Sequence, residues 1–175
     1  MSGEAAPEPK QYPTVYVETT VVSYLAANPS GDAVTRGLQK STQSWWANRA
    51  RWDLLTSTAV VGELVKGDHR TAVKRLELLA GIPLLTITPE TKLLAAELLR
   101  RGPLPPKARV DADHISIAAV YGVAYIVTWN LKHIANPAIR RRVDDICRAA
   151  GYRFPVACTP EELLASVADA KRSHR

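Results

Sequence analysis

The stretch DADHISIAAVYGVAYIVTWN, residues 111–130, contains the two elements that decide the fold. Its first part is an apolar segment that opens at Asp111 and ends at Gly122, which predicts a helix. Residues 124–128 follow as a run that is apolar on both faces, as expected for a buried strand of a parallel sheet. A helix directly before such a strand indicates an α/β protein.

The rest of the chain repeats this alternation of strands and helices. Short runs rich in β-branched, aromatic or other apolar residues predict further strands over residues 15–17, 53–56, 84–87 and 154–157. Helical spacing and capping residues predict further helices over residues 21–27, 32–51, 59–67, 69–81, 88–102, 137–150 and from residue 159 onward. We therefore expect a three-layer α/β/α fold with a central parallel sheet of four to five strands.

Length and composition describe an ordinary globular domain. The 175 residues fit one domain, expected over residues 13–168, with a flexible arm over residues 1–12 and a flexible tail over residues 169–175. No apolar stretch reaches the roughly 18–20 residues that cross a bilayer, and the polar, Pro-rich start does not resemble a secretory signal. Two cysteines without metal-ligand spacing fit buried thiols in a reducing compartment, so a cytoplasmic location is expected.

The charge balance favours a polyanionic partner. Lys and Arg number 23 against 17 Asp and Glu, a net charge of +6. A basic surface of this kind attracts nucleic acid above all, although many proteins without that role carry the same charge.

Acidic residues stand where a parallel sheet binds ligands, at the carboxyl ends of its strands. Glu18 ends the first strand, Glu63 lies in the helix after the second, Asp111 opens the helix before the strongest strand, and Asn130 follows that strand. Neighbouring carboxylates repel unless a cation lies between them, and Mg²⁺ prefers oxygen ligands. Such a metal can activate water for attack on phosphorus, which predicts hydrolysis of phosphodiesters.

Each acid also has a simpler interpretation. Asp111 could be only a helix N-cap, and Asp113 could only complement the helix dipole. Glu18 could be a solvated residue at a strand end, and Glu63 could pair with Lys66. A nucleotide-binding fold is disfavoured, because the chain has no glycine-rich phosphate motif.

Three segments resemble the signature blocks of PIN-domain proteins, and more narrowly those of VapC-type toxins from bacterial toxin–antitoxin pairs. They are VYVETTVVSYL (15–25), TSTAVVGELVKG (56–67) and DADHISIAAVYGVAYIVTWNLKHIANP (111–137). The resemblance spans roughly residues 13–165. It implies a PIN fold, an endoribonuclease that depends on Mg²⁺ or Mn²⁺, an antitoxin protein as partner, and a homodimer.

The resemblance also assigns roles by position. It implies a catalytic set of Glu18, Glu63, Asp111, Asn130 and Thr128. Glu18 stands where most PIN domains have Asp, and Asn130 stands where Asp is frequent. The missing negative charge at Asn130 favours one firmly bound metal over two, and Asp113 could restore that charge. The expected metal ligands are Glu18, Glu63, Asp111 and Asp113.

Candidate RNA contacts lie beside these residues in the sequence. Thr19 occupies a second small hydroxyl position of the family, and Lys107 and Arg109 stand just before Asp111. His133 follows Asn130 closely and could contact a phosphate or order a loop, and both it and His114 flank the expected site, although a structural or surface histidine is the simpler interpretation. The alternative function is a PIN-like module that binds RNA or a partner protein without cleaving it.

Overall fold

The computed structural model describes residues 12–172. Its centre is a five-stranded parallel sheet with the order β3-β2-β1-β4-β5. The strands are β1 (Thr14–Val17), β2 (Asp53–Ser57), β3 (Leu84–Leu85), β4 (Tyr125–Val127) and β5 (Val156–Cys158). The predicted parallel sheet of four to five strands is confirmed.

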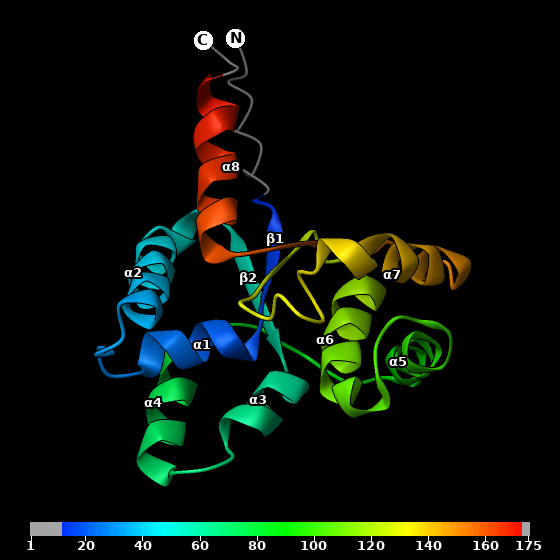
Figure 1. The fold of residues 1–175 in the computed structure, drawn as a ribbon, viewed down its shortest axis with the longest axis horizontal. Helices are drawn as coiled ribbons and strands as arrows, with labels where there is room; N and C mark the ends of the chain where they lie inside the picture. The colour runs from blue at the N-terminus through cyan, green and yellow to red at the C-terminus, as the bar shows by residue number, and fades with distance from the viewer. Residues whose placement is uncertain (1–11, 173–175) are drawn as a thin grey trace, which may run out of the picture.

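Helices cover both faces of this sheet (Figure 1). On one side, α5 packs against both α6 and α7, and on the other α1 contacts α2, α3 and α4, while α2 contacts α8. The helices of the described residues are α1 (Thr19–Ala26), α2 (Ala33–Ala47), α3 (Thr58–Leu64), α4 (His69–Leu78), α5 (Pro89–Arg101), α6 (Arg109–Val120), α7 (Pro137–Ala149) and α8 (Pro160–Arg172), with 3₁₀ turns at Arg49–Arg51 and Pro106–Ala108.

The core is built around the two central strands. Val15, Tyr16 and Val17 of β1 and Ile126 and Val127 of β4 have no exposed surface. Tyr16 is paired with Leu55 of β2 on one side and with Ile126 of β4 on the other, which places this residue on the central strand of the sheet. The residues that follow β1 and β4 are therefore held in fixed positions at the carboxyl edge of the sheet.

Several element boundaries differ from the sequence expectation. Strand β3 contains two residues rather than the four expected over residues 84–87, and α1 begins two residues early, at Thr19. The helix expected from Asp111 begins at Arg109 instead, so Asp111 lies in its first turn. The expected helix ends at Gly122 and Gly151 are supported, because both glycines follow their helices closely and have a positive φ.

The expected arm over residues 1–12 lies outside the described residues except for residue 12, and of the expected tail over residues 169–175 only residues 173–175 lie outside them. Helix α8 continues to Arg172. None of the helices over residues 12–172 is long and apolar enough to cross a membrane.

Candidate metal centre

Glu18 is the first carboxylate of the site and is almost completely buried, at 3% exposure. It directly follows β1 and acts as the N-cap of α1, because its Oε2 accepts the backbone N–H of Thr20 at 3.0 Å. The same oxygen accepts the hydroxyls of Thr20 at 2.5 Å and Thr128 at 2.8 Å. Three donors thus hold one oxygen, which leaves Oε1 to face the site. The alternative of a solvated strand-end residue is wrong.

Glu63 supplies a second carboxylate from the last turn of α3. Its Oε2 accepts the hydroxyl of Thr19 at 2.5 Å and lies 2.8 Å from Nε2 of His114. Burial alone would raise the pKa of Glu63, but the hydrogen bonds from His114 and Thr19 outweigh it and lower the pKa below its ordinary value. The carboxylate therefore favours its charged form.

His114 completes the group from α6 and is 1% exposed. Its Nδ1 lies 2.8 Å from the hydroxyl of Tyr16, and that hydroxyl lies 2.6 Å from Oγ of Ser57. Burial, with the charges of Glu18 and Glu63 adding to it, raises the pKa of Tyr16, so its phenol stays protonated. No role for His114 was predicted from the sequence. Its spacing of three residues from Asp111, on the same helix, is the signal that could have indicated one.

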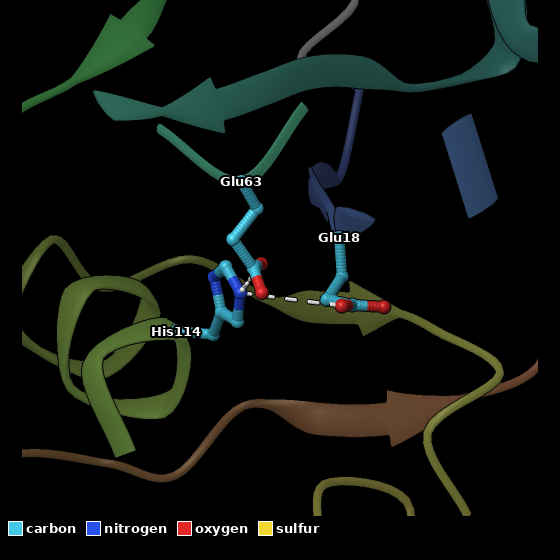
Figure 2. Close-up of side chains that lie close together, drawn as sticks. All are labelled: Glu18, Glu63 and His114. Carbon is cyan, nitrogen blue, oxygen red and sulfur yellow. Dashed lines mark hydrogen bonds and ion pairs between the residues drawn. The ribbon is translucent and has the colours of Figure 1, made fainter. Parts of the chain in front are cut away.

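Glu18, Glu63 and His114 converge on one point (Figure 2). One potential ligand atom from each lies within 4.8 Å of the others, and among residues 12–172 this is the one such group of three acidic, histidine or cysteine side chains. A metal bound at about 2.1 Å would hold opposite ligands about 4.2 Å apart, so a small adjustment brings the free oxygens of Glu18 and Glu63 to bonding distance of one ion. Two free carboxylate oxygens, with His114 close to Glu63 beside them, fit a divalent cation that prefers oxygen ligands.

Asp111, Asn130 and His133 form a second cluster. The side-chain amide of Asn130 donates to Oδ1 of Asp111 at 2.8 Å, and Nδ1 of His133 lies 2.7 Å from Oδ2. Asp111 makes no N-cap hydrogen bond, so the capping alternative is wrong. The backbone N–H of Asn130 donates to Oγ1 of Thr128, whose hydroxyl holds Glu18. Thr128 therefore joins the two clusters into one network.

The remaining candidates are placed around this network. Asp113 forms an ion pair with Arg109 over 3.5 Å and is not in the group that converges at Glu18. Lys107 and Arg109 are exposed just before Asp111. The structure thus brings together Glu18, Glu63, Thr19 and Thr128, and separately Asp111, Asn130 and His133. The roles predicted for all of these residues stay predictions.

Comparison with solved structures places the fold. VapC20 of Mycobacterium tuberculosis, a toxin that cleaves the sarcin–ricin loop, superposes with a TM-score of 0.55 at 22% identity, over 70% of this chain and 95% of that one. The fold is that of the VapC toxins. The resemblance to VapC proteins that the sequence segments indicated is therefore confirmed at the level of fold.

Two VapBC structures agree with this result. A chain of VapBC-1 from nontypeable Haemophilus influenzae matches with a TM-score of 0.52 at 16% identity, over 84% of this chain and 98% of that one. A chain of VapBC2 from Rickettsia felis, bound to a fragment of its promoter DNA, matches with a TM-score of 0.50 at 12% identity, over 83% and 98%. No family model matches the sequence, and no curated protein matches it. The VapC likeness thus rests on structure.

Proposed function

We propose that this protein is a metal-dependent endoribonuclease, acting as the toxin of a toxin–antitoxin pair. One observation carries the proposal. The buried carboxylate of Glu18 and the half-buried one of Glu63 lie together at the carboxyl edge of the sheet, and hydrogen bonds found in the described residues occupy only one oxygen of each. The VapC fold and the RNA-cleaving activity of the neighbour VapC20 support it.

The chain's own residues provide the binding site for Mg²⁺ or Mn²⁺. Glu18 and Glu63 would hold the ion through their free oxygens, and Asp111 would face it from the neighbouring cluster. A bound divalent ion supplies an activated water and stabilises charge on the phosphate. Thr128 and Thr20 donate hydrogen bonds to Glu18, and Thr19 donates one to Glu63, so each carboxylate is held by hydrogen bonds on one oxygen.

The surface beside the site suits an RNA backbone. Lys107 and Arg109 are exposed next to Asp111, and the chain carries a net charge of +6. Arg109 is also paired with Asp113, so Lys107 is the stronger candidate for a phosphate contact. The proposed substrate is RNA and the proposed partner is an antitoxin protein, with the two VapBC complexes as precedent. The protein would act in the cytoplasm as a homodimer.

Cleavage of defined RNAs tests this proposal. The purified protein is incubated with a sarcin–ricin loop hairpin, with ribosomal RNA and with an unstructured single-stranded RNA, in Mg²⁺, Mn²⁺ or EDTA. We expect cleavage of at least one RNA with either metal and none in EDTA. Glu63→Gln and Asp111→Asn are each expected to reduce the rate by roughly 100-fold or more, because second-sphere changes alone cost 10–100-fold.

Glu77→Gln is the matched control, since Glu77 is an exposed glutamate on α4. It should cleave at the wild-type rate. Cleavage that persists in EDTA and in both site variants would exclude the metal mechanism. Metal binding without cleavage of any RNA would instead favour the non-cleaving module.

A further inference from the structure

We propose that His114 is a positioning residue, which Tyr16 and Ser57 fix in one tautomer so that it aims Glu63 at the metal. This role rests on the proposed metal site and goes beyond it, because it gives a function to three buried residues, His114, Tyr16 and Ser57, that are not carboxylates. The three residues lie on α6, β1 and β2, whereas Glu63 lies on the short helix α3.

One assignment of the protons satisfies every donor and acceptor in the series of hydrogen bonds from Ser57 to Glu63. The backbone N–H of Val60 donates to Oγ of Ser57 at 3.3 Å, so the Ser57 hydroxyl can donate to Tyr16 at 2.6 Å. Tyr16 then donates to Nδ1 of His114 at 2.8 Å, and Nε2–H of His114 donates to Oε2 of Glu63 at 2.8 Å. A carboxylate can only accept hydrogen bonds, so the series of hydrogen bonds ends at Glu63 with each donor matched to an acceptor.

The opposite tautomer leaves two faults in the same place. With the proton on Nδ1, His114 would donate to Tyr16, and Tyr16 would donate to Ser57. The Ser57 hydroxyl, which is fully buried, would then have no acceptor among the described residues. Nε2 would also present a lone pair to Glu63 at 2.8 Å without a proton between them. Both faults are costly in a buried position, so the tautomer protonated on Nε2 is favoured.

The hydrogen bonds from Ser57 to Glu63 anchor the Glu63 carboxylate, which a short helix holds only weakly. Helix α3 contains only seven residues, and the side chain of Glu63 is 30% exposed. His114 and Tyr16, in contrast, are almost fully buried, and Tyr16 lies between β2 and β4. His114 therefore ties Glu63 to the rigid centre of the sheet. With Thr19 on the same oxygen, it leaves Oε1 of Glu63 for the metal.

Two replacements of His114 separate its two hydrogen bonds. The side-chain amide nitrogen of Gln can occupy the place of Nε2 and keep the donor to Glu63, whereas the shorter Asn keeps a partner for Tyr16 and loses that donor. We expect His114→Asn to weaken Mn²⁺ binding by roughly 10–100-fold in calorimetric titration of the full chain, and His114→Gln to retain affinity within a few-fold. Tyr16→Phe, which keeps the packing, should fall between the two.

Folding and metal binding are read separately. Each variant is melted in EDTA before titration, and His69→Asn, an exposed histidine at the start of α4, is the matched control with wild-type affinity. Equal loss of Mn²⁺ affinity in His114→Gln and His114→Asn, with both folded, would overturn the positioning role. Wild-type protein that binds no Mn²⁺ would instead refute the proposed metal site.

The tautomer has a spectroscopic test that needs no metal. In ¹⁵N-labelled wild-type protein, we expect the His114 nitrogen shifts of the Nε2–H tautomer, and a change in these shifts in Tyr16→Phe. This result can hold even if the metal site fails. Finding the Nδ1–H tautomer would overturn the inference, as would loss of the Nε2 proton on adding Mg²⁺, because His114 would then be a direct ligand.

Discussion

The side-chain amide of Asn130 donates to Oδ1 of Asp111 over 2.8 Å, so the segment that follows β4 is bound to the acid in the first turn of α6. Oδ1 of Asn130 accepts the backbone N–H of His133 at 3.0 Å, and the His133 ring lies 2.7 Å from the other oxygen of Asp111. The three residues close a ring of hydrogen bonds. An aspartate at position 130 could not donate to Asp111, so the amide suits this ring.

Asn130→Asp is therefore expected to destabilise the metal-free protein. It replaces a charge-assisted hydrogen bond by two facing carboxylates, at a cost of about 2 kcal/mol in the free energy of unfolding. That cost corresponds to a melting temperature lower by about 4–8 °C for a chain of this size. Thermal unfolding in EDTA measures it, and added Mg²⁺ should recover part of the loss because a cation relieves the repulsion.

The control for this change is Asn28→Asp. Asn28 is exposed, and among the described residues only its backbone carbonyl makes a hydrogen bond, so the new carboxylate removes no side-chain donor. Its melting temperature should stay close to that of the wild type. An Asn130→Asp protein as stable as the wild type in EDTA would contradict the account of the ring.

The lowered pKa of Glu63 predicts how stability depends on pH. Because the folded state holds this carboxylate charged, the contribution is present above the unfolded-state value of 4.5 and is lost as the pH falls through the lower folded-state pKa. Urea unfolding in EDTA should thus show the wild type more stable than Glu63→Gln at pH 7. The difference should shrink once the pH is below about 4.5.

The same series with Glu77→Gln provides the comparison, because Glu77 is exposed on α4. Its stability should follow that of the wild type at every pH. A gap between wild type and Glu63→Gln that widens on acidification would mean that the hydrogen bonds from His114 and Thr19 do not favour the charged form.

The sequence predicted which residues lie at the carboxyl edge of the sheet better than it predicted the hydrogen bonds they make there. Parallel strands bring their carboxyl ends together, so the positions of Glu18, Glu63 and Asn130 followed from element order alone. Which oxygen meets which donor depends on tertiary packing. His114 was overlooked because a histidine within a run of apolar residues is more often structural, and both of its partners are distant in the sequence, Tyr16 by 98 residues and Glu63 by 51. The start of α6 was misplaced because Asp111 has the character of an N-cap.

Thr128→Val tests the residue that joins the two clusters. Valine has nearly the same shape but removes the donor to Glu18 and the acceptor for the N–H of Asn130. Thr128 is fully buried, so we expect a loss of about 2 kcal/mol in the free energy of unfolding. Urea titration should show a lower midpoint with an unchanged slope.

Thr86→Val makes the same change at an exposed residue and should alter stability by no more than about 0.5 kcal/mol. If Thr128→Val were equally silent, the hydroxyl would contribute nothing to holding Glu18. Weaker Mn²⁺ binding in Thr128→Val, with the folded state intact, is the further result expected if Glu18 is a ligand.

The two cysteines should be inert in the folded protein. Both are buried and free, as the sequence suggested, and burial raises the pKa of each thiol to about 12, with Asp144 adding to the effect at Cys147 and Glu162 at Cys158. Only the thiolate reacts with disulfide reagents, so native protein at pH 8 should be labelled slowly and unfolded protein at once.

Ser44→Cys, at an exposed position on α2, provides a fast-reacting control. Labelling of Cys147 or Cys158 in the native state as fast as that of the control would show that its helix or strand opens readily. Labelling that instead accelerates with urea in step with unfolding would show that α7 and β5 open only with the whole domain.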